Sequence, residues 1–157
     1  MASLETTSTF TDEAIEFFAH VSVAIGAQRS IGMIYGLLFA TEEPLSLDDI
    51  VERLQISKGS ASTGLRFLRT VGAVKSKIIL GQRREHFEPE LALRKLVAGF
   101  LQQTVEPHLN NAPDWLDRLE SAAEQDDNAV ARERTKTLKH WHTATKRLMP
   151  FVLKFIK

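Results

Sequence analysis

The segment from Ser57 to Arg69, SKGSASTGLRFLR, has the length of a helix but carries small residues through its first half. Small and hydroxyl-bearing residues are mediocre helix formers, so packing must stabilise such a helix. Ala61, Leu65 and Leu68 recur at helical spacing and predict one narrow buried stripe. The opposite side offers glycine, serine, threonine and long basic side chains. We therefore predict a helix over residues 58–71 that packs through one side and leaves the other side slim and basic.

The residues before this helix predict a second helix that ends in a short turn. Ser46 and Asp49 have the spacing of a capping box, and apolar residues follow at helical intervals until Leu54. Gln55 and Ile56 are then left as the turn, and Ser57 is placed to cap the next helix.

The residues after Gly72 alternate between apolar and basic side chains, which is typical of strands. We predict a two-stranded hairpin over residues 73–88 with Gly81-Gln82 as a two-residue turn. A helix, a turn, a helix and a basic hairpin together predict a winged helix-turn-helix, here over residues 29–89.

Helical patterns flank this unit on both sides and make the fold class mainly α. Residues 1–28 predict a tail and a helix capped by Thr11, and residues 90–157 predict a helical region interrupted at Asn110–Pro113 and again near Pro150. The apolar C-terminal segment FVLKFI needs a cover, and a partner subunit is the simplest one. Gly32 and Gly36, four residues apart, predict the close approach of another helix.

Charge is distributed unevenly along a chain whose net charge is zero. Residues 53–84 hold eight bases and no acid. A local run of bases favours contact with phosphates, and slim side chains allow a helix to enter the major groove. The predicted DNA contacts are the small and basic residues of the helix and the residues near the hairpin turn: Ser57, Lys58, Gly59, Ser60, Ser62, Thr63, Arg66, Arg69, Gln82, Arg83 and Arg84.

Three other interpretations of these residues stay open. A winged helix can bind protein instead of DNA, an architectural protein can bind DNA without sequence preference, and the helix can belong to an unrelated bundle with a solvated basic side. Only sequence-specific binding predicts both a preferred duplex and a salt-dependent affinity.

The sequence lacks the residues that several classes of metal, redox and catalytic site need. The chain has no cysteine, which excludes disulfides and thiolate metal sites. His140 and His142 are two residues apart, so on a helix they point to different sides. No metalloprotease, phosphate-loop or dinucleotide motif occurs. We expect no catalytic activity, no metal and no cofactor. The absence of an apolar run long enough for a membrane span, and of a secretory signal, predicts a cytoplasmic protein without membrane contact.

Several separated motifs resemble one family in the expected order. RSIGMIYGLLFA, EPLSLDDI, LQISKGSASTGLRFL, VGAV and GQRREHF are similar to the GbsR group of MarR-related winged-helix regulators, across about residues 25–90. The resemblance implies a homodimeric transcriptional regulator whose winged helix reads a palindromic operator in double-stranded DNA. It also implies that the helices of both flanks, residues 1–28 and 90–157, build the dimer. A repressor is the expected form, and some members of the group sense choline or glycine betaine.

A quaternary ammonium effector would need an aromatic cage, because cation–π contact binds such an ion in a desolvated site. The aromatic candidates are Tyr35, Phe100, Trp115 and Trp141. Aromatic residues at helical spacing more often belong to a core, so the cage is a hypothesis beside that simpler interpretation.

Overall fold

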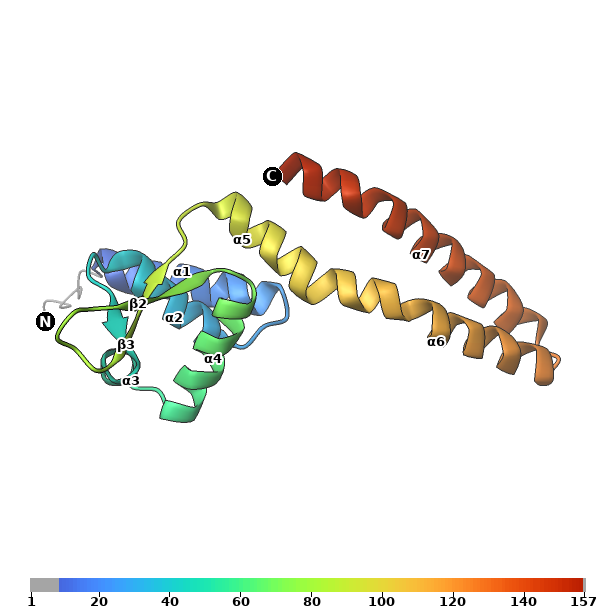
Figure 1. The fold of residues 1–157 in the computed structure, drawn as a ribbon. Coiled ribbons are helices and arrows are strands. Elements are labelled where there is room, and N and C mark those ends of the chain that lie inside the picture. Colours follow the sequence, from blue (N-terminus) through green and yellow to red (C-terminus); the bar gives the residue numbers. More distant parts are fainter. Residues whose placement is uncertain (1–8, 157) are drawn as a thin grey trace, which may run out of the picture. The chain divides into compact units, whose positions relative to one another are not determined.

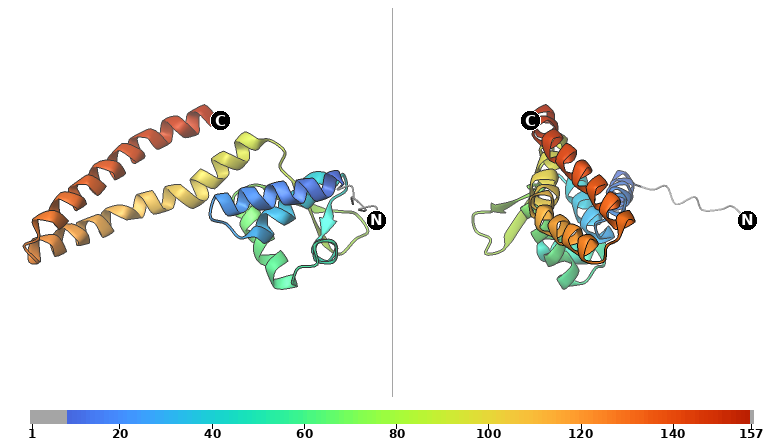
Figure 2. Two further views of the ribbon diagram at one scale, coloured as in Figure 1. Left: turned by 180° about the vertical axis from the view of Figure 1, so that it is seen from behind. Right: turned by 90° about the vertical axis from the view of Figure 1, so that its right-hand side faces the viewer.

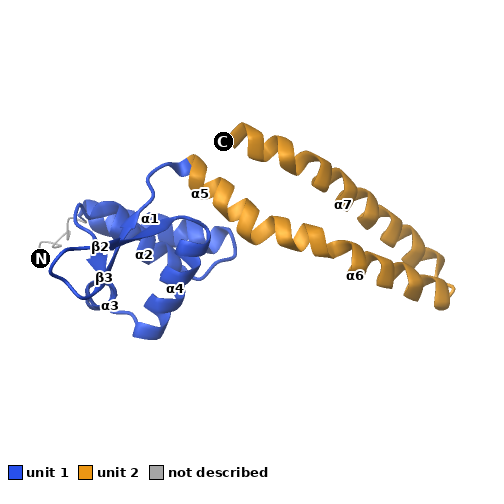
Figure 3. Cartoon of the chain, in the orientation of Figure 1, with its two compact units in different colours: residues 1–93 blue, residues 94–157 orange. Residues whose placement is uncertain are grey.

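The computed structural model describes residues 9–156, and the chain divides into two compact units, residues 1–93 and 94–157 (Figure 3). The three functional regions predicted from the sequence, with boundaries after residues 28 and 89, stay predictions. Each unit is described by itself below. Across residues 9–156, no helix combines the length and the apolar character needed to cross a bilayer.

The first unit contains four helices and a small sheet (Figure 1). In chain order the elements are α1 (Phe10–Ala24), α2 (Arg29–Ala40), β1 (Leu45–Ser46), α3 (Leu47–Leu54), α4 (Lys58–Thr70), β2 (Val74–Ile78) and β3 (Glu85–Pro89). The largest fully buried side chains are Ile34, Leu38 and Ile50, from α2 and α3. The predicted stripe of α4, Ala61, Leu65 and Leu68, is buried as well. The two helices of the helix-turn-helix, α3 and α4, thus pack against α2.

Helices α1 and α2 pack together at very short distance (Figure 2). A Cβ placed on Gly36 would lie 2.6 Å from the Ala14 carbonyl oxygen and 2.7 Å from the Ile15 Cα. At Gly32 it would overlap the Phe18 carbonyl oxygen. The prediction that these two glycines admit a neighbouring helix is confirmed.

The helix caps show how local spacing selects the first residue of a helix. Ser46 and Asp49 form the predicted capping box, and Ser57 caps α4 by accepting the Ser60 amide at 3.1 Å. The predicted cap at Thr11 is wrong, because Thr9 caps α1 with Asp12 as its reciprocal partner. A box at Thr11 would need an acid or amide three residues on, and that residue is Ala14.

The predicted two-stranded wing is confirmed as β2 and β3, and β1 adds a third strand to it in the order β1-β3-β2. Leu45 of β1 pairs with Phe87, and Ser76 of β2 pairs with the same residue from the other side. Both pairings are antiparallel. The third strand was not predictable from alternation, because β1 is only two residues long.

The turn of the hairpin is also longer than predicted. The last pair of the ladder joins Ile78 to Glu85, which leaves residues 79–84 as the loop. Gly81 has φ +84°, and the Gln82 amide donates to the Ile79 carbonyl oxygen at 3.0 Å. These values describe a turn with glycine in its third position, where positive φ is needed, and not a two-residue hairpin turn.

The second unit is helical over residues 94–125 and 129–156, with a short turn between them. A helical run passes from α5 (Leu93–Phe100) through a π-helical turn (Leu101–Val105) into α6 (Glu106–Gln125), and α7 (Ala129–Ile156) packs against α6 (Figure 1). The predicted break at Asn110–Pro113 is wrong, because Pro113 lies inside α6, and Pro150 lies inside α7 and does not end that helix.

Helix α6 continues past Pro113 because another helix supplies the missing donor. Proline has no N–H, so the Leu109 carbonyl oxygen, four residues earlier, has lost its usual partner. His142 of α7 provides Nε2 at 2.7 Å from that oxygen. Since a carbonyl oxygen only accepts, Nε2 carries the hydrogen.

We expect Gly36→Ala to destabilise the first unit by about 1–3 kcal/mol, because the new methyl group meets the backbone of α1. The control is Gly59→Ala on α4, where a Cβ meets only the Ser57 Oγ at 3.9 Å. This control should gain about 0.5–1 kcal/mol from helix propensity. Urea unfolding followed by circular dichroism measures both, and equal stability of the two variants would contradict the close contact.

We expect His142→Ala to destabilise the second unit by about 1–3 kcal/mol, because the Leu109 carbonyl oxygen loses its donor. Adding Pro113→Ala should restore much of this loss, since an alanine amide at position 113 can donate to the same oxygen. Thermal unfolding of the single and double variants tests the coupling. Purely additive effects would show that His142 does not compensate for the proline.

Candidate nucleic-acid interface

Helix α4 presents its slim side to solvent and its apolar stripe to the core. Ser62, Thr63 and Arg66 are exposed, whereas Gly64 is buried. A Cβ on Gly64 would lie 2.5 Å from the Ile34 Cδ1 of α2. Gly64 therefore serves the packing of α4 on α2, and the other small residues form the exposed surface.

A groove of about 780 Å³ runs beside this exposed side of α4. Its walls come from the start of α3, from α4, and from the residues around the start of β3. The groove brings together five of the predicted DNA contacts, Lys58, Ser62, Arg66, Arg69 and Arg84, with Ser46, Leu47, Asp48, Leu65, Thr70, Glu85 and Phe87.

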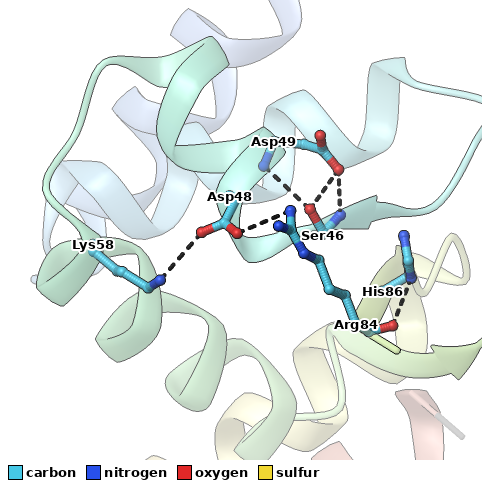
Figure 4. Close-up of polar contacts among 6 residues, drawn as sticks. All are labelled: Ser46, Asp48, Asp49, Lys58, Arg84 and His86. Atoms are coloured by element: carbon cyan, nitrogen blue, oxygen red, sulfur yellow. Dashed lines mark hydrogen bonds and ion pairs between the residues drawn. The ribbon is translucent and has the colours of Figure 1, made fainter. Parts of the chain in front are cut away.

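Asp48 joins two of these cations across the groove (Figure 4). Its Oδ1 lies 3.2 Å from the Lys58 Nζ, and its Oδ2 lies 3.1 Å from the Arg84 Nη1. The three residues come from α3, α4 and the loop before β3. Sequence reasoning missed Asp48 as a site residue, and its signal was its place in the first turn of the helix that precedes α4.

Other acids pair with further bases of the run. Glu85 lies 3.3 Å from Arg69, and across the hairpin Glu88 and Glu90 lie 3.2 Å and 2.7 Å from Lys77 and Lys75. Five of the eight bases in residues 53–84, all of them described, are therefore in ion pairs. Arg66 makes no ion pair within residues 9–156, so the middle of α4 keeps an uncompensated cation.

Hydrogen bonds hold the two backbone segments that carry Asp48 and Arg84. Ser46 donates from its Oγ to the Asp49 Oδ2 at 2.6 Å and from its amide to the same oxygen at 2.9 Å (Figure 4). These bonds lower the pKa of Asp49 and hold the first turn of α3. On the other side, the Nδ1 of the buried His86 donates to the Arg84 carbonyl oxygen at 2.9 Å.

The remaining predicted contacts lie outside the walls of this groove. Gln82 and Arg83 are exposed in the loop 79–84. Ser57 and Ser60 bond to each other at the start of α4, and Gly59 and Thr63 are exposed on it. The assignment of DNA contact to all these residues stays a prediction.

The predicted aromatic cage also stays a prediction. Tyr35 is buried in the first unit, packs edge-on against Phe18, and donates its hydroxyl to the Glu90 carbonyl oxygen at 2.7 Å. Burial raises its pKa to about 12. The other three candidates belong to the second unit, and within residues 94–156 no ring contact joins Phe100, Trp115 and Trp141 to one another.

Comparisons with known proteins agree with this fold. The HTH-type transcriptional repressor GbsR of Bacillus subtilis (strain 168) is 34% identical over 89 residues, which are 57% of this chain and 49% of that protein. The chain thus matches about half the length of this curated relative, and the resemblance to the GbsR group is confirmed over that part. No family model matches the chain.

Two solved structures align with most of the chain. A crystal structure of a transcriptional regulator aligns with a TM-score of 0.67 and 18% identity, over 92% of this chain and 95% of that one. A mutant of S. aureus MepR bound to an oligodeoxyribonucleotide aligns with a TM-score of 0.44 and 18% identity, over 85% and 89% of the two chains. The first alignment confirms the predicted fold class.

Proposed function

We propose that this chain is a homodimeric, sequence-specific DNA-binding transcriptional regulator that acts as a repressor. The observation that carries the proposal is the exposed slim side of α4. Arg66, which makes no ion pair within residues 9–156, lies at its centre, and Lys58 and Arg69 lie beside it. The similarity to a transcriptional repressor over 89 residues supports the same conclusion.

The proposed complex places α4 in the major groove. Hydroxyl groups of Ser62 and Thr63 leave room for the backbone to approach the duplex and can bond bases or phosphates. The amides of Lys58 and Gly59 precede the first intrahelical bonds, and a helix N-terminus favours a phosphate. Arg66 reaches a guanine edge, where a guanidinium can form two parallel hydrogen bonds.

The hairpin over residues 73–88 serves as the wing in this proposal. Arg83 and Arg84 lie in its exposed loop and reach the adjacent DNA backbone. Phosphate contacts position the protein without reading sequence. Specificity then depends on α4, and overall affinity depends on the bases at its margins.

A second copy of the chain is the proposed cover for the helices of the second unit. Within residues 94–156 only Ala98, Ala123, Thr135 and Leu153 are buried. Large apolar side chains are exposed on α6 and α7: Trp115, Leu119, Val130, Leu138, Trp141, Leu148, Phe151, Val152 and Phe155. A dimer would bury this surface and would present two copies of α4 to half-sites about one helical turn, roughly 10 bp, or a multiple apart.

The proposed function is tested by selecting duplexes from a random pool and titrating the selected duplex in fluorescence anisotropy. We expect Arg66→Ala to weaken binding by about 5- to 150-fold and to relax the preference at one base pair, because a base contact is lost. Arg53→Ala on α3, also an exposed base but outside the groove, is the matched control and should change affinity far less.

The salt dependence separates the alternatives. Arg83→Ala should lower the slope of log affinity against log salt by about one unit with little change in sequence preference, as a phosphate contact does. Binding without a preferred duplex would indicate an architectural protein. A chain that binds no duplex at any salt concentration would refute the proposed function in favour of a protein-binding module.

Sedimentation velocity tests the proposed dimer. We expect Phe155→Ser, at a side chain that is 91% exposed, to weaken dimerisation by roughly 10- to 100-fold, because a phenyl ring would lose its burial against the partner. Arg147→Ser, an exposed polar position of the same helix, is the control. An unchanged dimer in Phe155→Ser, or a wild-type monomer at every concentration, would contradict this interface.

A further inference from the structure

We propose that Asp48 acts as an intramolecular substitute for a DNA phosphate. Its carboxylate forms ion pairs with Lys58 and Arg84 in the free protein, and these pairs lower the affinity of the groove for every duplex. This inference rests on the proposed function, because it concerns the same groove.

The geometry of Asp48 is that of a bridging anion. Each carboxylate oxygen faces a different cation, at 3.2 Å and 3.1 Å, and the two cations come from α4 and from the wing loop (Figure 4). A DNA phosphate that lay between α4 and the wing would offer its two free oxygens to the same two groups. Carboxylate and phosphate bind lysine and arginine through the same charge-assisted hydrogen bonds.

The side chains of the two cations can exchange partners, whereas the helical turn that carries the anion is held in place. The side chains of Lys58 and Arg84 are both 69% exposed, and exposed ion pairs contribute little to stability. Asp48 lies in the first turn of α3, which the bonds between Ser46 and Asp49 hold in place. When phosphates take the two cations, the Asp48 charge therefore remains at the edge of the groove and repels them.

Asp48 affects the residues that contact phosphates in the proposed complex, and not the residue that reads the bases. Lys58 and Arg84 lie at the margins of α4 and in the wing, where phosphates are contacted in the proposed complex. Arg66, the proposed base-reading residue, has no such partner within residues 9–156. Since every duplex carries the same phosphates, Asp48 lowers affinity without changing sequence preference.

The variant that tests this role is Asp48→Asn, which removes the charge and keeps the shape. Glu52→Gln, also exposed on α3 but outside the groove, makes the same change in net charge and is the matched control. Asp48→Ser is a second variant at the same position. Thermal unfolding establishes that each full-length chain is folded before binding is measured.

Two measurements follow on the folded chains. We expect Asp48→Asn to bind both the selected duplex and an unrelated labelled duplex about eightfold more tightly at about 0.1 M salt, with a salt slope steeper by about one unit, since one more effective charge faces DNA. On a heparin column, a sulfated polyanion without base sequence, it should elute at higher salt than wild type and Glu52→Gln.

Each alternative result has a separate meaning. Elution of Asp48→Asn together with Glu52→Gln overturns the inference, whether or not the wild-type chain binds DNA. Weaker duplex binding by Asp48→Asn also overturns it, because the ion pairs would then hold the two cations in place for DNA. A wild-type chain that binds no duplex refutes the proposed function and, with it, the role of Asp48 in DNA binding.

Discussion

The close packing of α2 on two of its neighbours is the constraint on which the first unit depends. The α1 backbone lies where side chains at Gly32 and Gly36 would otherwise stand, and Gly64 lets α4 approach Ile34 on α2. Tyr35 adds a hydrogen bond from α2 to the chain just beyond β3. The direction of α4, and with it the exposed side that carries Arg66, follows from how deeply these helices interlock.

Ion pairs make the groove of this unit less positive than the run of bases in residues 53–84 indicates. No acid interrupts the eight bases of residues 53–84 in the sequence, yet acids from α3, from β3 and just after β3 pair with five of them in space. Such pairs keep a DNA-binding surface from holding any polyanion strongly, because non-specific binding is almost entirely electrostatic.

Local patterns predicted most of the winged helix, and interactions across long sequence separations account for what they missed. The capping box of Ser46 and Asp49 and the glycine pair of α2 were predictable, because three- and four-residue spacings determine them. The pairing of Leu45 with Phe87 and the bridge from Asp48 to Arg84 join residues about 40 positions apart. Neither the spacing of apolar residues nor the order of charges along the sequence reveals such contacts. Thr9 and Thr11 differ as caps only in the residue three positions later.

The proline in α6 has a consequence for how the second unit folds. A helix with Pro113 in its interior cannot complete its own hydrogen bonds, and the donor that replaces the missing amide, His142, lies 33 residues beyond Leu109 in the chain. Helix α6 therefore reaches full stability only once α7 has folded back on it. The two helices form and melt as one cooperative hairpin, so an isolated α6 peptide would fray near Leu109 while the hairpin stays intact.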